Sequence, residues 1–353
     1  MGLWDWVMDK LAGDQKSSET TARAADQTGP GRENAIAVAE PPAGSVAAES
    51  GDCWWVRPDA HLTELAPVPR TQLSAELLAL ENIIASYFDG HDMNLPQMPR
   101  VPEVVLRELS STDYSLRKIG REIAADQVSA ASVLRLANSP LYRGMNQITA
   151  VEPAVIRLGA GAIRTLMLHQ TMSALTRAER RASQRLAEIL SVRSVACGAT
   201  MRLLSKFTGM DPEEAFIVGL LHDIGSVMVL RIINRQKPYA GRVDFDTFEF
   251  LAYETHQEFG ELLADSWNLP PKLGAILSNH HAYPDEHDPF RTDRLALHVT
   301  NIIGGLLGFA FEAPYDLLNA RALQDLGLAD HPDFMQFLAR LPDDIDDALQ
   351  AFG

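Results

Sequence analysis

The stretch that decides the fold is GLLHDIGSVMVL, residues 219–230, in which His222 and Asp223 are the only ionisable side chains. Just before it, Asp211 and Pro212 combine an N-cap carboxylate with a proline at the first helical position. A helix is therefore expected to start there and to end at His222. An imidazole beside a carboxylate is costly to bury in an apolar run unless both are paired or bind a metal. The stretch predicts a buried helix end whose polar pair has a specific partner.

Helix signals recur on both sides of this stretch, and no segment shows the strict alternation expected of strands. Residues 149–152 (TAVE) have the capping-box pattern, and Gly159 is expected to end the short helix that follows. Residues 255–258 (THQE) repeat the pattern, which would put His256 at the first position of a helix. The two prolines at 270–271 end one helix and start the next. We predict an all-α fold.

The sequence suggests five parts. They are a short amphipathic element (1–11), a disordered linker (12–52), a helical lead-in (53–91), a main domain (92–310) and C-terminal helices (311–353). Within the main domain, we predict an N-terminal helical subdomain at about 95–175 and a second one at 180–310. The acidic stretch 342–347 is expected to belong to a helix that covers a face of the body.

The first part has an apolar stripe at helical spacing, made by Leu3, Trp4, Val7, Met8 and Leu11. The linker after it is rich in Ala, Ser, Thr, Gly, Pro and Glu, and such a composition cannot bury enough surface to offset the entropy of ordering. Three interpretations stay open for residues 2–11: a peptide that docks on a partner, a weak membrane contact, or a segment that packs back on its own domain.

Composition restricts the classes of partner. Lys+Arg 31 against Asp+Glu 47 gives a net charge of −16, which argues against broad binding to nucleic acid. A local basic cluster at residues 177–185 is most simply a solvated helix face. The chain contains only Cys53 and Cys197, shows no signal-peptide pattern, and shows no apolar run of the roughly 20 residues that span a bilayer. We expect a cytoplasmic protein.

Potential metal ligands gather in three places near expected helix ends. They are His222 with Asp223, His256, and His280 with His281. Helix-end ligands on three segments can converge, and a set of histidines and one aspartate suits iron, manganese or zinc. The alternative is that these histidines only cap helices and that His280 and His281 form a surface pair.

Several runs of the sequence together resemble the HDOD family. They are LPQMPRVPEVVLREL (95–109), LRLANSPLYRGMNQITAVEPAVIRLGAGAIRTLML (134–168), GLLHDIGSVMVL (219–230) and HQEFGELLADSWNLPPKLGAILSNHH (256–281). HDOD domains are bacterial relatives of the HD phosphohydrolases and of the HD-GYP cyclic-dinucleotide phosphodiesterases. The resemblance covers about residues 92–310. It implies two helical subdomains and a role in signalling, often with an incomplete catalytic set.

Two departures bear on mechanism. Arg193 stands where the resemblance would place the first ligand histidine, and Asn301 stands where it would place a final aspartate. A guanidinium cannot ligate a metal, so Arg193 is expected either to pair with Asp223 or to hold a phosphate. The Gly-Tyr-Pro loop of the HD-GYP relatives is reduced here to Tyr283-Pro284.

These departures favour a non-catalytic regulatory protein that acts through protein contacts, with residues 2–11 as one candidate contact, or that senses a ligand such as a nucleotide second messenger. The alternative is a metal-dependent phosphohydrolase or cyclic-nucleotide phosphodiesterase that uses Arg193 as a phosphate clamp. A two-ion phosphodiesterase needs both metals to activate the attacking water, and this chain lacks part of that ligand set.

Overall fold

The computed structural model describes residues 75–89, 95–142, 144, 146–309 and 316–352, and these are helical with no strand among them. The elements are α2 (Ala75–Asp89), α3 (Arg100–Leu109), α4 (Leu116–Ala124), α5 (Gln127–Asn138), α6 (Val151–Thr208), α7 (Pro212–Leu221), α8 (Ile224–Arg235), α9 (Phe245–Ser266), α10 (Pro271–Leu277), α11 (Arg291–Leu307), the 3-10 turn η2 (Leu317–Asn319), α12 (Arg321–Asp325) and α13 (Phe334–Phe352). The all-α prediction is confirmed. The predicted amphipathic element and linker, residues 1–52, lie outside the described residues.

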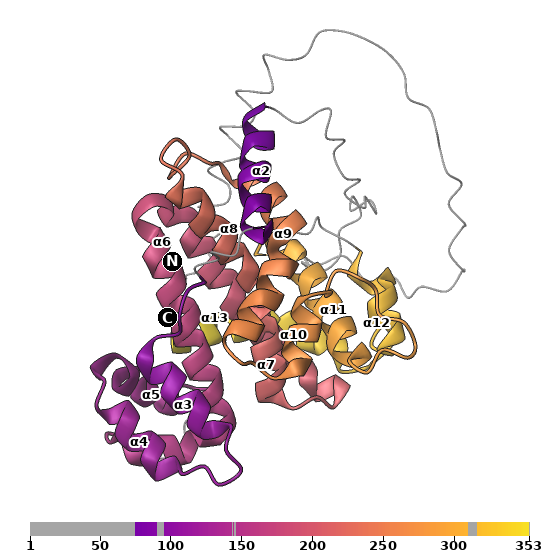
Figure 1. Ribbon diagram of the computed structural model, residues 1–353. Coiled ribbons are helices and arrows are strands. Elements are labelled where there is room, and N and C mark those ends of the chain that lie inside the picture. Colours follow the sequence, from indigo (N-terminus) through magenta and orange to yellow (C-terminus); the bar gives the residue numbers. More distant parts are fainter. Residues whose placement is uncertain (1–74, 90–94, 143, 145, 310–315, 353) are drawn as a thin grey trace.

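Helix α6 is the axis on which α3, α4, α5, α7, α8, α11 and α13 pack (Figure 1). Its backbone leaves helical geometry at Gly159 (φ 72°, ψ 178°) and at Ser183 (φ −133°, ψ 66°), so its 58 residues form three segments. A positive φ favours glycine, and the break expected at Gly159 is confirmed. At the second bend, the Ser183 hydroxyl donates to Asn234 (2.6 Å), whose amide donates to the buried Glu179 (2.9 Å).

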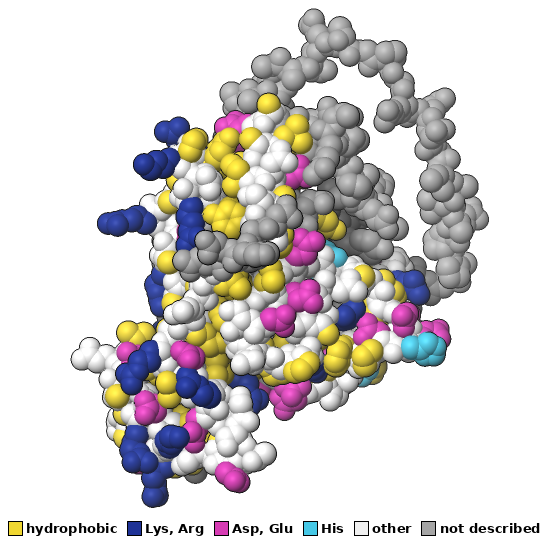
Figure 2. All heavy atoms as spheres, viewed as in Figure 1, with side chains coloured by type: hydrophobic (Ala, Val, Ile, Leu, Met, Phe, Trp, Pro, Cys, Tyr) yellow, Lys and Arg dark blue, Asp and Glu magenta, His cyan; other side chains and the backbone are white. Residues whose placement is uncertain are grey.

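Two groups of helices flank α6. Helices α3, α4 and α5 pack against it to form a separate lobe, while α7, α8 and α11 pack against it in the main body (Figure 1). Helix α6 runs through the predicted boundary near residues 175–180. On the face seen in Figure 2, Lys and Arg side chains lie mainly on the α3–α5 lobe and along the left edge of the body.

Helix α13 covers part of α6, as expected for the acidic C-terminal stretch. The Phe352 ring stacks on Phe216 at 4.8 Å between centroids and meets the His169 ring edge-on at 5.0 Å. The helix continues through Pro342.

One predicted helix start is wrong, and one predicted capping box is absent although its helix starts at Val151. Residues 255–258 lie inside α9, which begins ten residues earlier with Asp244 as its N-cap, accepting from the Thr247 amide. The Thr255 hydroxyl donates to the Leu251 carbonyl (2.8 Å) instead of capping a helix. At residues 149–152, the N-cap is Ala150, which makes no side-chain cap bond.

Helices α7 and α8 together, Pro212–Arg235, form the one stretch of the described residues that is long and apolar enough to cross a membrane. The sequence did not reveal this stretch, because His222 and Asp223 interrupt the apolar run. Its most apolar window is 94% buried inside the protein. Such burial is compatible with the core of a soluble protein.

Candidate metal centre

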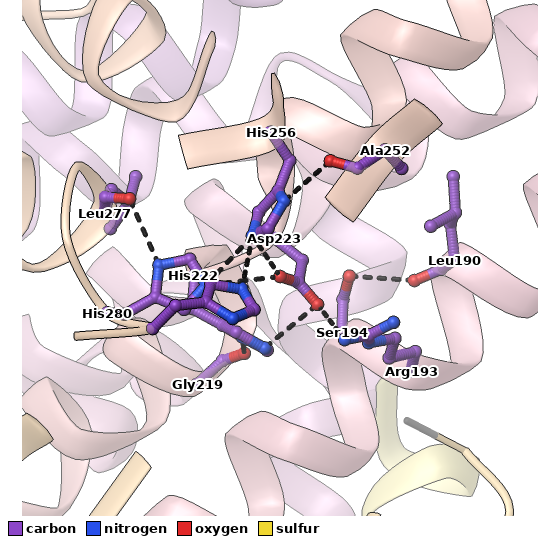
Figure 3. Close-up of polar contacts among 11 residues, drawn as sticks. Leu190, Arg193, Ser194, Gly219, His222, Asp223, Ala252, His256, Leu277 and His280 are labelled. Carbon is purple, nitrogen blue, oxygen red and sulfur yellow. Dashed lines mark hydrogen bonds and ion pairs between the residues drawn. The ribbon is translucent and has the colours of Figure 1, made fainter. Parts of the chain in front are cut away.

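Three segments bring their ionisable side chains to one point in the body (Figure 3). His222 and Asp223 lie between α7 and α8, His256 lies in the middle of α9, and His280 and His281 follow α10. The helix start expected at His256 is wrong, yet its side chain still faces the other ligands. One atom from each of Asp223, His256, His280 and His281 lies within 4.8 Å of the others.

Glycine at position 225 makes this convergence sterically possible. An added Cβ at Gly225 would overlap the carbonyl oxygen of His256. The first turn of α8 can therefore approach α9 backbone to backbone, directly beside the Asp223 side chain. Sequence reasoning missed this role, although a glycine two residues after the His-Asp pair is a visible signal.

The two carboxylate oxygens of Asp223 face different partners. Its Oδ2 lies 2.5 Å from a terminal nitrogen of Arg193 and 3.0 Å from Nε2 of His222. Its Oδ1 lies 3.3 Å from Nε2 of His256 and 3.5 Å from Nε2 of His280. The carboxylate thus separates a side held by Arg193 and His222 from a side that faces His256 and His280.

Contacts with backbone carbonyls fix the tautomer of two ligand histidines. Nδ1 of His256 lies 2.7 Å from the Ala252 oxygen, and Nδ1 of His280 lies 3.1 Å from the Leu277 oxygen. Because a carbonyl oxygen only accepts, each Nδ1 carries the hydrogen, and each neutral ring presents a bare Nε2 lone pair.

The lone pairs of His256 and His280 face one another, and the His281 ring lies beside them. Nε2 of His256 lies 3.0 Å from Nε2 of His280 and 3.0 Å from Nε2 of His281. Two ligand atoms that each lie about 2.1 Å from one ion are roughly 3.0–3.4 Å apart. The spacing and the facing lone pairs fit a single cation. The carbonyls of Ala252 and Leu277 orient the rings of His256 and His280 as metal-bound histidines require.

The imidazoles of His256, His280 and His281 are neutral at neutral pH. Burial lowers the pKa of His256 to about 4 and that of His281 to about 2, and it also lowers the pKa of His280. Burial raises the pKa of the Asp223 carboxyl, but the charges of Arg193 and His222 outweigh it and hold that pKa well below its usual range. The site therefore offers neutral imidazoles and one carboxylate, which is a transition-metal donor set.

Arg193 occupies the place that the sequence analysis gave it. It lies on α6, is 4% exposed, and pairs with Asp223, which is one of the two roles expected for it. Its guanidinium puts a fixed positive charge against Oδ2 of Asp223.

Asn301 is not joined to the cluster. It lies buried on α11, and its Oδ1 has no hydrogen-bond partner. No hydrogen bond or ion pair among the described residues connects its amide with the metal-ligand candidates. Its role as a ligand therefore stays a prediction.

A second cluster supports the ligand loop after α10. The Tyr283 hydroxyl donates to Asp325 of α12 (2.7 Å), which also pairs with Arg291 of α11 (2.6 Å). The guanidinium of Arg321 lies 4.3 Å from the centre of the Tyr283 ring. The C-terminal helices thus hold the segment that carries His280 and His281. Sequence reasoning missed Asp325 and Arg291, because only the fold brings them to Tyr283.

The comparisons with known proteins agree with this architecture. The HDOD domain family matches residues 95–283, which is more than half of the chain. This chain belongs to the HDOD domain family. The family match ends at Tyr283, so the supporting residues Arg291, Arg321 and Asp325 lie beyond it.

One curated relative is an uncharacterized protein of Treponema pallidum (strain Nichols), 24% identical over 238 residues. The aligned part covers 64% of this chain and 44% of that protein, so the HDOD chain spans less than half of its relative.

Three solved structures share the fold. A candidate metal-dependent phosphohydrolase of Shewanella amazonensis SB2B has a TM-score of 0.65 at 18% identity, over 80% of this chain and all of its own. An HDOD domain protein of unknown function from Geobacter sulfurreducens has a TM-score of 0.56 at 22% identity, over 78% and 98%. A candidate signal transduction protein of Marinobacter aquaeolei VT8 has a TM-score of 0.56 at 15% identity, over 80% and 67%. Identities this low show the fold alone.

Proposed function

We propose that this HDOD protein is a non-catalytic signalling module whose body is held together by one divalent transition metal. The ligands would be Asp223, His256, His280 and His281. A bound ion would supply the positive charge that satisfies Oδ1 of Asp223 and the imidazole lone pairs. Zinc suits a four-ligand set of this kind, and iron or manganese could use the same donors.

The observation that carries this proposal is the division of the Asp223 carboxylate. Oδ1 faces His256 and His280, and Oδ2 is held by Arg193, so the aspartate cannot bridge two ions without losing its ion pair. Hydrolysis by two metals requires such a bridged pair of ions. A guanidinium supplies charge at the second position but cannot activate water as a metal does.

The burial of the candidate ligands also favours a non-catalytic site. His256 is 3% exposed and His280 is 1% exposed, and the protein supplies four donors from three segments. Structural zinc sites are closed by four protein ligands, whereas catalytic sites keep a position open for water or substrate. The arrangement favours a structural or sensing ion, and it favours output through protein contacts.

The test is metal analysis of the freshly purified full chain by mass spectrometry, together with a hydrolysis assay on a cyclic dinucleotide. We expect about one transition metal per chain, its loss in His256→Ala, and its retention in His287→Ala, which changes an exposed histidine outside the cluster. We expect no turnover. Absence of metal would refute the metal centre. Metal-dependent hydrolysis that disappears in His256→Ala would instead show that the phosphohydrolase alternative is correct.

A further inference from the structure

A large cleft separates the α3–α5 lobe from the body, away from the metal-ligand candidates. Its volume is about 1200 Å³, and it runs between α3 and α6 on one side and α7, α10 and the turn after α9 on the other. Figure 2 shows hydrophobic side chains where the lobe meets the body. Drug-sized ligands fill pockets of about 300–1,000 Å³, so this cleft has room for a peptide.

Apolar and polar side chains both line the cleft. Leu106, Ile217 and Trp267 line the cleft, and Arg164 and Lys272 stand among the polar residues that line it. Grooves of this type accept the apolar face of an amphipathic helix, with anchors spaced one turn apart.

Fixed contacts hold the walls in place. The indole nitrogen of Trp267 donates to the Pro96 carbonyl (2.9 Å), which ties the end of α9 to the segment before α3. Lys272 pairs with Asp293 (2.9 Å) and with Glu214 (3.3 Å). The cleft is therefore preformed, and binding would not require it to open first.

Arg164 is the cation of the cleft that lacks an acidic partner. One of its terminal nitrogens donates to the Leu109 carbonyl (3.3 Å). Within the described part of the chain, no carboxylate lies within ion-pair distance of this guanidinium. An occupant that carries a carboxylate on its polar face would complete the pairing.

We propose that residues 2–11 of the same chain, GLWDWVMDKL, bind in this cleft as an amphipathic helix. The apolar stripe of that segment, which includes Trp4 and Val7, repeats at the spacing that a helix-binding groove accepts, and Asp5 and Asp9 supply carboxylates for Arg164. A peptide this short is not a stable helix in water alone, so a groove supplies the cover that its apolar face lacks.

Chain length permits the contact. The linker predicted at residues 12–52 would, as a flexible chain, have a root-mean-square span of about 35 Å. A tether of this kind gives an effective concentration in the millimolar range. The cleft would then be occupied even if its affinity for the segment were low. A partner protein that binds the cleft or the apolar face of residues 2–11 would have to displace the segment. This inference does not depend on the metal centre.

Hydrogen exchange on the full chain tests the proposal. The variant Trp4→Ser/Val7→Ser removes two anchors, and the matched control Ile36→Ser/Val38→Ser makes the same kind of change in the sequence between the segment and α2. We expect backbone amides of residues 100–110 and 266–273 to exchange several-fold faster in the first variant and at the wild-type rate in the control. A synthetic peptide of residues 2–11 should slow that exchange again, and Arg164→Glu should weaken this rescue.

Equal exchange in the wild type and in both variants would overturn the proposal. So would protection that rises with protein concentration, because it would show that the occupant comes from a second copy of the chain. Failure of the added peptide to restore protection would also count against a direct contact.

Discussion

Arg193 and Asp223 form a buried ion pair whose side chains are 5% and 6% exposed. Removing one partner leaves the other charge buried without compensation, which typically costs about 3–5 kcal/mol. We therefore expect Arg193→Ala to lower the free energy of unfolding by that amount. The measurement is urea denaturation in the presence of a chelator, so that no metal ion can replace the guanidinium.

Arg340→Ala is the matched control. Arg340 lies 4.0 Å from Asp344 with 72% of its side chain exposed, and removing such a pair changes stability by about 0–1 kcal/mol. If Arg193→Ala loses no more than this control, Arg193 does not act as the counter-charge of Asp223. The double variant Arg193→Ala/Asp223→Asn should recover part of the loss, because it removes the stranded charge.

His169 offers a pH-dependent prediction away from the metal-ligand candidates. It lies on α6 against the Phe352 ring, and burial, with smaller contributions from the charges of Arg177 and Arg135, lowers its pKa to about 4. The unfolded side chain titrates near 6.5. As the pH falls from about 6.5 to about 4, the unfolded chain binds a proton at this histidine and the folded chain does not. The free energy of unfolding therefore decreases by at most about 1.4 kcal/mol per pH unit.

His169→Gln should remove this contribution. Urea denaturation at pH 7, 6 and 5 should therefore give a flatter dependence of the free energy of unfolding on pH than the wild type gives. His287→Gln, at an exposed position, should keep the wild-type slope. An unchanged slope in His169→Gln would mean that the folded protein accepts the proton at this site.

At the scale of elements, local signals predicted some helix boundaries and misplaced others. The start of α7 was predicted correctly, because the Asp211 carboxylate accepts from two first-turn amides and Pro212 fits the first helical position. Residues 255–258 have a capping pattern, but they lie within α9, where an i−4 carbonyl satisfies the threonine hydroxyl. A capping box has no effect where the chain before it is already helical, and that state depends on Asp244 and on packing against α8.

The loop after α10 depends on the C-terminal helices. Tyr283 lies two residues after His281, and its hydroxyl bond to Asp325 fixes the end of the loop. Groups hydrogen-bonded directly to metal ligands typically change metal affinity by about 10–100-fold. The Tyr283–Asp325 bond lies one step further out, so we expect an effect at the low end of this range. We expect Tyr283→Phe and Asp325→Asn each to weaken zinc binding about tenfold in a competition titration with a chromophoric chelator, without loss of stoichiometry.

Tyr114→Phe is the control, since Tyr114 is 43% exposed and precedes α4 in the other lobe. It should bind zinc as the wild type does. Wild-type affinity in both Tyr283→Phe and Asp325→Asn would show that the loop is positioned without this contact. Loss of metal from the wild type itself would refute the metal centre and leave the supporting contact untouched.

At the scale of the whole molecule, the sequence named the ligand candidates and predicted that the three segments could converge, but it did not show which contacts bring them together. Ionisable side chains in an apolar run require a partner, which is why His222 and Asp223 could be singled out. Their connection to His256 depends on a long-range approach of α8 to α9 that Gly225 permits. The pairing of Arg193 with Asp223 was one of two roles expected for this arginine, and the packing of α6 against α8 brings the two side chains together.

The metal centre should determine which helices of the body open most readily to amide exchange. Its ligands join the α7–α8 junction, α9 and the loop after α10, whereas none lies in α3, α4 or α5. An ion at 1,000 times its dissociation constant stabilises the state that binds it by about 4 kcal/mol. Removing it with a chelator should therefore speed amide exchange in residues 245–284 much more than in residues 100–138. Hydrogen exchange with and without EDTA measures this, and His256→Ala should show no response to EDTA.

Equal acceleration in both regions would mean that the ion stabilises the chain only through global unfolding. No acceleration anywhere would mean that the cluster holds no ion that contributes to folding.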